Sequence, residues 1–546
     1  MKKIYALGLL AGLSVPAWAA STPCDQLANL KLPHTEITAA TLVAAGAFTP
    51  RPNPNQQQMA PPAGAPGQNL QAPGAQPGPM GQPQAGGLGG PGGPGGGPGQ
   101  QNAVYKTLPA FCHVQASLRP TADSRIDIEV WLPADGWTGR LEAVGNGGFG
   151  HNIMFNNFAE GVAKGYVVTG SDTGHQSDDS TFAIGHPEKL VDWGYRAMHE
   201  NVVAAKAIVA AYYGSAPKYS YYNGCSTGGR QGWVAAEYYP KDFDGLAIGD
   251  PANPMTRLQA NTIYDNLELT KDEAHFIPTA KWAMIHQTVL AACDEKDGLK
   301  DGLVADWTKC NFDPNSLLCK NGDAADCLTA SQIESLKVIA GGSKNPRTGE
   351  ALYPGYPIGI NMQGPVVGKN PDNSAPTVFR ALFQDANWDY HTFNFDTDTA
   401  RADKLGNNLI NAVDPAKLSQ VFAHGGKIIL YHGWNDPAIT PLISINLYED
   451  AVKANGGVAK TYNDIRLFMV PGMNHCGGGE GPNTFDKLDA ISAWVEQGKA
   501  PDQIVASHAT AGKIDRTRPL CPYPQVAKYK GSGSIDEAAN FACAKP

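Results

Sequence analysis

Short apolar runs of strand type alternate with helical periodicity in the first part of the chain. Residues 125–132, 139–144, 165–171 and 218–223 are β-rich runs, and residues 193–213 follow a helical period. Such alternation predicts an α/β domain with a mostly parallel sheet. Apolar runs at 427–431 and 464–470 predict two further buried strands.

This rhythm is lost between residues 251 and 418, where Gly, Pro and Asn are frequent and four cysteines crowd between 293 and 327. The simplest interpretation is one sheet domain interrupted by a long insertion, the lid, over 251–418. The sheet domain then comprises residues 21–50 and 103–250 as its first part and 419–546 as its second part.

A low-complexity stretch lies near the start of the sheet domain. Residues 51–100 contain 27 glycines and prolines and a single charge, Arg51. Such a composition cannot bury a core, so we expect residues 51–102 to be a flexible Gly/Pro/Gln-rich surface insertion. The alternative, a linker between two independent domains, is weaker because few residues precede it.

The N-terminus has the features of a secretory signal. Lys2 and Lys3 precede an apolar run at 4–13, and Ala17-Trp18-Ala19 offers a cleavage site, so we expect residues 1–20 to be removed and the protein to be secreted or periplasmic. An N-terminal membrane anchor is the alternative. No later apolar run reaches the roughly 18 residues of a membrane span. The net charge of −9 without a basic tract also argues against a nucleic-acid partner.

Ten cysteines, an even number without a CxxC pair, favour disulfides over zinc in an exported protein. One of them, Cys225, belongs to a catalytic motif. Residues 224–228 read Gly-Cys-Ser-Thr-Gly and fit G-x-S-x-G, between a β-rich run at 219–223 and a helical stretch at 230–239. This context predicts a nucleophile elbow with Ser226 as the nucleophile. The alternative is a glycine-rich turn whose serine caps the helix.

A serine nucleophile needs a histidine base and an acid, which follow it in the order Ser, Asp, His in α/β-hydrolases. Asp436 follows the run at 427–431, and His475 follows the run at 465–470, so both come where strands end.

Cys225 and Cys476 adjoin Ser226 and His475. If the serine and histidine are within hydrogen-bond reach, the two cysteines can form a disulfide that ties nucleophile to base. Cys225 as a thiol nucleophile is a weaker alternative, because the even cysteine count favours disulfides.

A tetrahedral intermediate needs oxyanion donors. We expect the backbone N–H of Thr227, the residue after the nucleophile, to be one of them. The glycine-rich loop at 145–150 can supply the second, with Gly148 preferred and Gly147 close behind.

An acidic loop lies in the lid. Asp294, Asp297 and Asp301, with Asp306 nearby, alternate with glycines in a turn whose carbonyls at Leu299 and Leu303 can point inward. Carboxylate and carbonyl oxygens suit Ca²⁺, although the spacing is not that of an EF-hand. The alternative is an acidic solvated loop.

Together these motifs resemble the tannase and feruloyl esterase family of secreted serine esterases, over nearly the whole chain except the insertion at 51–102. The resemblance is carried by residues 145–149 (Gly-Asn-Gly-Gly-Phe), 171–175 (Ser-Asp-Thr-Gly-His), 224–229 (Gly-Cys-Ser-Thr-Gly-Gly), 433–436 (Gly-Trp-Asn-Asp) and 471–476 (Pro-Gly-Met-Asn-His-Cys).

The resemblance implies an α/β-hydrolase sheet domain with a large inserted lid, a Ser226, Asp436 and His475 triad, and a Cys225–Cys476 disulfide. It also implies structural calcium held in the lid by Asp294, Asp297, Asp301 and the carbonyls of Leu299 and Leu303. The remaining cysteines are expected to pair as Cys24–Cys112, Cys293–Cys310, Cys319–Cys327 and Cys521–Cys543.

The expected activity is hydrolysis of esters of aromatic acids, of feruloyl esterase or tannase type, through an acyl-enzyme. A hydrolase of terephthalate half-esters is the alternative, and a non-catalytic binding module or a peptidase on the same scaffold is less favoured. Four lid aromatics, Phe379, Phe383, Trp388 and Tyr390, either contact the acyl ring or form the lid core, and Arg380 is either a surface charge or a partner for an acidic substrate.

Overall fold

The computed structural model describes residues 21–50, 104–362, 367–369 and 374–546. The expected signal at 1–20 and the expected insertion at 51–102 therefore lie outside the described residues. Among the described residues, no helix combines the length and the apolar character that a membrane crossing requires.

Nine strands form one mixed sheet in the order β1-β2-β3-β5-β4-β6-β7-β8-β9. Strands β1, β2, β3 and β5 pair antiparallel, whereas the run β5-β4-β6-β7-β8-β9 is parallel throughout. The strands are β1 (Thr35–Val43), β2 (Phe111–Leu118), β3 (Ile126–Pro133), β4 (Arg140–Val144), β5 (Val167–Ser171), β6 (Tyr219–Cys225), β7 (Gly245–Gly249), β8 (Lys427–Gly433) and β9 (Ile465–Val470). Each run predicted as a strand is a strand, with bounds displaced by one or two residues.

The sheet is buried on both faces, which explains why its parallel strands read as continuous apolar runs. In β8, Ile428 and Leu430 join the core on the side of helices α5 and α12, whereas Ile429 and Tyr431 join the core on the side of α2 and α14. The helices around the sheet are α2 (Phe155–Ala163), α3 (Pro187–Val191), α4 (Ala197–Tyr213), α5 (Thr227–Tyr238), α12 (Leu442–Ala454), α13 (Val458–Thr461) and α14 (Lys487–Gln497). This arrangement fits an α/β-hydrolase fold.

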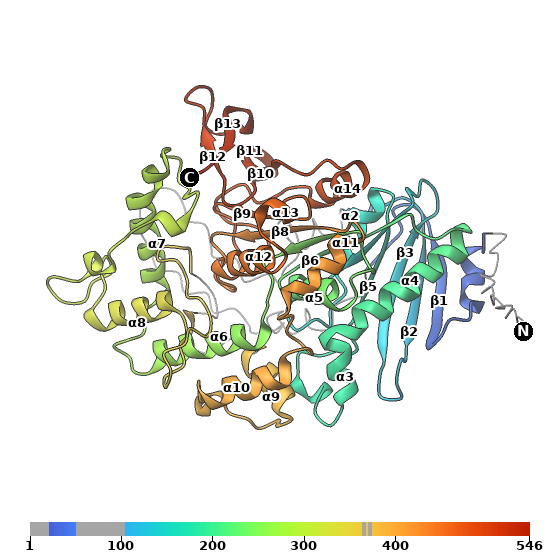
Figure 1. Cartoon of the computed structure of the whole chain (residues 1–546), viewed down its shortest axis with the longest axis horizontal. Helices are drawn as coiled ribbons and strands as arrows, with labels where there is room; N and C mark the ends of the chain where they lie inside the picture. The colour runs from blue at the N-terminus through green and yellow to red at the C-terminus, as the bar shows by residue number, and fades with distance from the viewer. Residues whose placement is uncertain (1–20, 51–103, 363–366, 370–373) are drawn as a thin grey trace, which may run out of the picture.

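The chain between β7 and β8 leaves the sheet and forms the helical part that lies toward the left and bottom of Figure 1. Its helices are α6 (Met255–Thr270), α7 (Thr279–Cys293), α8 (Ala330–Gly341), α9 (Ser374–Phe383) and α10 (Thr397–Gly406). Its helices α6, α9 and α10 share an apolar cluster with Phe149, Trp193 and Ile443 of the sheet domain, whereas α7 and α8 pack into the core of the sheet itself. The last helix before β8, α11 (Leu418–Ala423), packs on α5 beside the sheet instead.

The predicted helix at 193–213 is divided in the structure. A π-helical turn (Asp192–Arg196) precedes α4, which begins at Ala197. The buried guanidinium of Arg230 accounts for this wider π-helical turn, because it donates hydrogen bonds to the carbonyls of Trp193 and Gly194 at 3.3 and 3.0 Å. Gly194 also lies against the end of the lid, where a β-carbon would be 2.5 Å from the carbonyl oxygen of Leu409.

The last part of the chain contains two hairpins outside the large sheet, which the sequence interpretation did not anticipate. Strands β10 (Ile504–Thr510) and β11 (Lys513–Leu520) form one, and β12 (Val526–Tyr529) and β13 (Phe541–Ala544) form the other. These two hairpins are called the hairpin module below.

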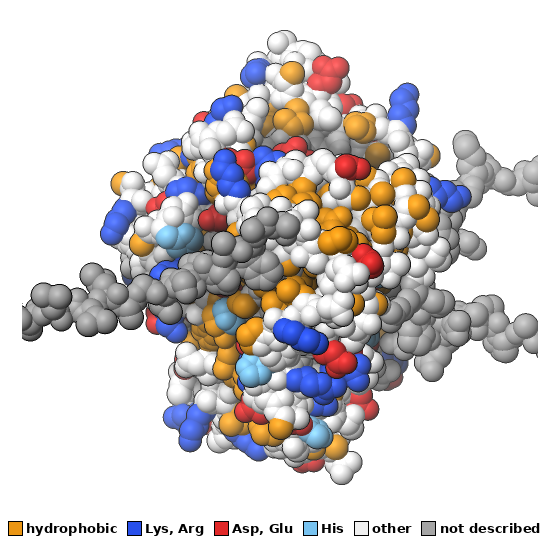
Figure 2. All heavy atoms as spheres, turned by 90° about the vertical axis from the view of Figure 1, so that its right-hand side faces the viewer, with side chains coloured by type: hydrophobic (Ala, Val, Ile, Leu, Met, Phe, Trp, Pro, Cys, Tyr) orange, Lys and Arg blue, Asp and Glu red, His pale blue; other side chains and the backbone are white. Residues whose placement is uncertain are grey.

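Five disulfides join all ten cysteines in the pairs that the family resemblance implies, including Cys521–Cys543 in the hairpin module. On the face shown in Figure 2, basic and acidic side chains are scattered among each other instead of forming one field.

Candidate active site

Ser226 occupies a sharp turn between β6, which ends at Cys225, and α5, which begins at Thr227. Its backbone angles are φ 66° and ψ −123°, a strained conformation for a residue with a side chain. The residue is 8% exposed. This strand–turn–helix geometry is that of a nucleophile elbow, which presents a hydroxyl at the end of the sheet.

Two glycines make room for this turn. A β-carbon at Gly224 would be 2.5 Å from Tyr222 Oη, and one at Gly145 would be 2.3 Å from the same oxygen. Tyr222 Oη in turn donates to the carbonyl of Gly228 at 2.5 Å. Glycine at these positions lets the glycine-rich loop after β4 approach the start of α5 closely.

His475 and Asp436 form a hydrogen-bonded pair at the ends of β9 and β8. His475 Nδ1 lies 2.7 Å from Asp436 Oδ2, and Asp436 Oδ1 accepts from the N–H groups of Ala438 and Ile439 at 2.8 and 3.0 Å. Asp436 is fully buried. Two backbone donors and one imidazole thus fix the orientation of the carboxylate.

The charges of this pair support each other. Burial opposes ionisation of Asp436, but His475 and His432 outweigh it and hold the pKa of Asp436 below its ordinary value. Burial likewise disfavours the imidazolium of His475, and the carboxylates of Asp436 and Asp250 outweigh it, so that the pKa of His475 is raised to about 9.

The disulfide between Cys225 and Cys476 brings the two halves of the site together. Its Cα atoms are 5.9 Å apart, and it joins residues separated by 251 positions. Because Cys225 precedes Ser226 and Cys476 follows His475, this bond holds the serine elbow beside the imidazole. The structure therefore pairs Asp436 with His475 and places the chain at Ser226 beside the chain at His475.

The glycine-rich loop lies against the N-terminus of α5. Thr227 Oγ1 donates to the carbonyl of Gly148, and the N–H of Thr227, in the first turn of α5, is one of the groups without an intrahelical acceptor. The loop is braced from behind, because Thr173 Oγ1 donates to Gly150 O and Trp193 Nε1 donates to Phe149 O, both at 2.8 Å. Thr227 and Gly148 are thus adjacent, as two oxyanion donors must be.

Three positioning residues near this centre were missed from the sequence. Gln231 Oε1 accepts from the N–H of Asn146 at 3.0 Å and so holds the base of the glycine-rich loop. Asp250 lies directly after β7, and His432 lies within β8, both fully buried beside Asp436. The strand-end rule that selected Asp436 could have found Asp250, had the short strand β7 been recognised.

The acidic loop of the lid turns its carboxylates toward its own backbone. Asp294 accepts from the N–H groups of Asp301 and Gly302, and Asp297 accepts from those of Leu299 and Ala305. Burial raises the pKa of Asp297 to about 6, with Asp301 and Asp294 adding to the shift.

The acids of this loop do not form a convergent cluster. Within the described ranges, groups of three or more His, Cys, Asp or Glu whose ligand atoms lie within 4.8 Å of one another occur at Asp250, Asp436 and His475 and at Cys225, Asp250 and Cys476. Asp306 instead accepts from the N–H of Thr308 and begins a short 3₁₀ helix.

The lid aromatics pack mainly on one another. The rings of Phe379, Phe383 and Trp388 lie 5.3 to 5.6 Å apart by their centroids, and Phe393 joins them. Tyr390 stacks on His391 at 4.0 Å. Arg380 Nε donates to the carbonyl of Trp388 at 3.1 Å, so it braces this cluster. These contacts fit the lid-core alternative.

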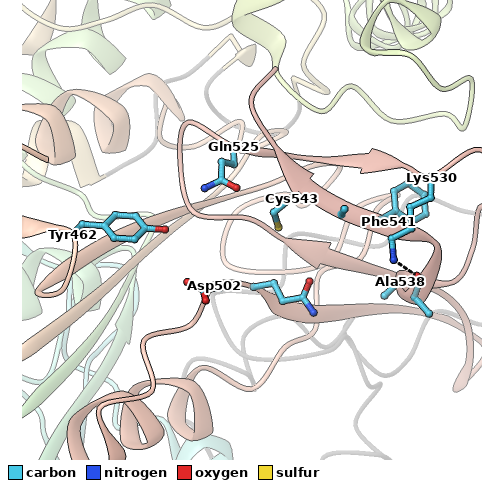
Figure 3. Close-up of a pocket in the computed structure, with 10 residues that line it drawn as sticks. Tyr462, Asp502, Gln525, Lys530, Ala538, Phe541 and Cys543 are labelled. Atoms are coloured by element: carbon cyan, nitrogen blue, oxygen red, sulfur yellow. Dashed lines mark hydrogen bonds between the residues drawn. The ribbon is translucent and has the colours of Figure 1, made fainter. Parts of the chain in front are cut away.

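Two hollows lie near the C-terminal hairpins. One, of about 470 Å³, is lined by Tyr462, Asp502, Gln525, Lys530 and Phe541 among others, and no triad residue lines it. Figure 3 shows these side chains around its opening, with the Lys530 ammonium held by the carbonyl of Ala539 at 2.8 Å. The second, of about 300 Å³, lies between the acidic loop and the hairpins and is lined also by Trp434 and Pro471.

The chain is similar to known esterases over most of its length. Residues 112–544 match the family model described as tannase and feruloyl esterase. The chain is 36% identical to an uncharacterized esterase of Xanthomonas campestris pv. campestris, over 96% of this chain and 92% of the relative. It is 31% identical to a mono(2-hydroxyethyl) terephthalate hydrolase of Piscinibacter sakaiensis, over 80% of this chain and 85% of that protein.

Among solved structures, feruloyl esterase B from Aspergillus oryzae superimposes with a TM-score of 0.80 at 26% identity. The match covers 95% of this chain and 99% of that structure. The similarity therefore includes the sheet, the helical insertion and the C-terminal part together.

Proposed function

Because the chain belongs to the tannase and feruloyl esterase family and is a carboxylic ester hydrolase, we propose that it cleaves esters of aromatic carboxylic acids through an acyl-enzyme. One observation carries this proposal. The Cys225–Cys476 disulfide holds the Ser226 elbow beside His475, and Nδ1 of that histidine contacts Asp436.

In this mechanism Ser226 Oγ attacks the ester carbonyl while His475 Nε2 takes the serine proton. Asp436 accepts from His475 Nδ1, so Nε2 carries the free lone pair in the neutral imidazole. The N–H groups of Thr227 and Gly148 stabilise the oxyanion. His475 then returns the proton to the leaving alcohol, and water, activated by the same base, releases the acid from Ser226.

Phenolic acyl groups are favoured over the half-esters of terephthalate. Selection of a terephthalate half-ester requires a cation near the distal carboxylate. Arg380, the lid cation considered for an acidic substrate, instead donates to the carbonyl of Trp388 in the lid core at 3.1 Å. Relatives named feruloyl esterase, such as feruloyl esterase C of Talaromyces stipitatus, point the same way.

The test is a comparison of kcat/KM on methyl ferulate, methyl gallate and a terephthalate half-ester, with Ser226→Ala as the matched control. We expect one of the two phenolic esters to be cleaved at least tenfold faster than the half-ester, and Ser226→Ala to lose activity on all three. Preference for the half-ester would contradict the proposed acyl group. Full activity of Ser226→Ala would contradict the mechanism.

Calcium is proposed as a structural ion in the acidic loop, because the donor set consists of hard oxygens in a partly buried turn. The carboxylates of Asp294, Asp297 and Asp301 and the carbonyls of Leu299 and Leu303 would hold it. Bound there, the cation would offset the repulsion among the three acids and brace the loop against the C-terminal hairpins. Arg518, which pairs with Asp301 at 2.5 Å, supplies part of that charge from β11.

Export from the cytoplasm is proposed as well. Five disulfides favour an oxidising compartment, and the sequence of residues 1–20 has the signal pattern described above. Mass spectrometry of the protein purified from the periplasm or the culture medium would identify the mature N-terminus and show whether it follows residue 19 or 20.

A further inference from the structure

Asp250 is a second buried carboxylate at the active site, and the mechanism above gives it no role. It directly follows β7, and its side chain is fully buried. Its backbone has φ 36°, an unusual conformation for a residue with a side chain, so the surrounding contacts must hold it there.

The carboxylate of Asp250 touches three segments at once. Its Oδ1 accepts from the N–H of Gly433, three residues before Asp436, at 3.0 Å. Its Oδ2 accepts from the N–H of Cys476, directly after His475, at 2.5 Å. The same oxygen lies 3.4 Å from Cys225 Sγ, directly before Ser226. One side chain thus fixes the spacing of the loops that carry acid, base and nucleophile.

Burial raises the pKa of Asp250 and Asp436 adds to the shift, whereas His432, His475 and the N–H of Cys476 oppose it. His432 Nε2 lies 3.9 Å from Asp250 Oδ1 and 3.2 Å from Asp436 Oδ2, while its Nδ1 is 2.7 Å from Ser444 Oγ. Among the described residues, Asp436, His475 and Tyr431 also interact electrostatically with Asp250.

The hydrogen bonds to Asp250 favour its ionised form. In the described part of the chain, both of these hydrogen bonds come from backbone N–H donors. Such donors stabilise the ionised carboxylate more than the neutral carboxyl group. The ligand atoms of Asp250, Asp436 and His475 all lie within 4.8 Å of one another, so this charge acts directly on the imidazole.

We propose that ionised Asp250 is a positioning residue of the esterase, which locks the Asp436 and His475 loops against the nucleophile elbow and stabilises the imidazolium of His475. This inference rests on the proposed roles of Ser226, Asp436 and His475. Asp250 acts through the base and contacts no reacting atom.

The test is Asp250→Asn, assayed by the pH dependence of kcat and kcat/KM on p-nitrophenyl acetate. An amide has one oxygen, so one of the N–H groups of Gly433 and Cys476 loses its acceptor. We expect kcat to fall about 10- to 100-fold because the loops shift. We expect the acid limb of kcat/KM to move about one pH unit lower, because the neutral residue no longer favours the imidazolium.

Two matched variants separate positioning from loss of fold. Glu142→Gln replaces another fully buried carboxyl on the same sheet. Burial raises the pKa of Glu142 to about 8, so this group is already mostly neutral at pH 7 and the acid limb of the variant should stay in place. Asp250→Glu keeps the charge but displaces it, and should lower kcat with the acid limb near that of the wild type. It also serves as the test if Asp250→Asn does not fold.

An acid limb unchanged in Asp250→Asn, with activity lost only in proportion to unfolded protein, would overturn the inference. So would an Asp250→Glu enzyme with the kcat of the wild type. Ser226→Ala is assayed alongside, because full activity in that variant would refute the proposed triad itself. Melting curves and the absence of titratable thiols establish the folded fraction of each variant.

Discussion

At the scale of single residues, the site depends on two buried carboxylates, Asp436 and Asp250, that lie close to the imidazole of His475. Asp436 contacts the ring of His475 directly, whereas Asp250 contacts the backbone next to it. The direct contact selects the tautomer in which Nδ1 carries the proton and Nε2 is free to act as base. The contact of Asp250 with the backbone N–H of Cys476 fixes the position of His475. The two acids therefore affect catalysis by different routes.

Asp436→Asn tests the direct contact. The amide can donate to Nδ1 and so stabilise the tautomer with the proton on Nε2, which cannot take the serine proton. We expect kcat to fall about 10³- to 10⁴-fold with a small change in KM. The measurement is steady-state kinetics on methyl ferulate, with the exposed Asp389→Asn as control. A loss below tenfold would mean that another group orients His475.

At the scale of elements, two long-range contacts join the loops of the sheet to each other and to the lid. The Cys225–Cys476 disulfide links the end of β6 to the loop after β9. His286 on α7 of the lid pairs with Glu480 in the loop after His475, at 3.1 Å, and Glu480 also accepts from Asn435 at 2.9 Å. The lid thus contacts both the base loop and the acid loop.

Removal of the central disulfide should cost more than removal of a short-range one. In the chain-entropy account, a loop of 251 positions corresponds to roughly 5 kcal/mol and one of 8 positions to roughly 2.5 kcal/mol. We therefore expect the Cys225→Ala/Cys476→Ala double variant to unfold at lower urea than Cys319→Ala/Cys327→Ala. It should also lose kcat, which the control pair should keep. Equal kcat in the two variants would show that the disulfide does not position Ser226.

The His286–Glu480 contact predicts a pH-dependent tether of the lid. Burial opposes the imidazolium, but Glu480 outweighs it and the pKa of His286 is raised. A raised pKa in the folded state means that the stabilisation is present below pH 6.5 and is lost as the pH rises through the folded-state value. Because Glu480 is one-third exposed, we expect about 1 kcal/mol.

Glu480→Gln measures this tether. Its melting temperature should lie below that of the wild type at pH 6 and approach it at alkaline pH. His391→Gln, which breaks the exposed pair with Asp389, is the control and should show little difference. A gap between wild type and Glu480→Gln that stays constant with pH would indicate packing instead of charge.

At the scale of the whole molecule, the acidic loop is where the lid meets the C-terminal hairpins. Arg516 Nη1 donates to the carbonyl of Asp301 at 3.0 Å, and Lys528 Nζ donates to that of Asp297 at 3.1 Å. With Arg518 on the Asp301 carboxylate, three basic residues of the hairpin module hold the loop. These three contacts, one to a carboxylate and two to backbone carbonyls, join the acidic loop of the lid to the C-terminal hairpins.

Removal of calcium by a chelator should therefore lower the melting temperature of the protein and leave its kcat nearly unchanged. With EGTA we expect a melting temperature several degrees lower, restored by added Ca²⁺, because a ligand that binds only the folded state stabilises it. The kcat on methyl ferulate below the transition should change less than twofold. Asp297→Asn should lower the melting temperature in Ca²⁺ and remove the response to EGTA. An unchanged melting temperature of the wild type in EGTA would contradict a structural ion.

The sequence by itself determined the elements and the chemistry that are local in the chain. Apolar runs of five to seven residues identified β4, β6, β8 and β9, because a strand buried on both faces admits few polar residues. The G-x-S-x-G turn identified the elbow at Ser226, because only small neighbours fit that backbone. The motifs that carry the family resemblance supplied the acid, the base and the cysteine pairs.

Only the tertiary structure decided which distant groups converge. His432 and Gln231 have no sequence signal that separates them from ordinary buried polar residues, and Asp250 has one only once the short strand β7 is recognised. Their roles appear when β7, β8 and α5 bring them beside the triad. The same holds for His286 and Glu480, which are 194 positions apart. The physical reason is that a hydrogen bond depends on positions within a fraction of an ångström, whereas the apolar pattern of a sequence specifies only which face of an element is buried.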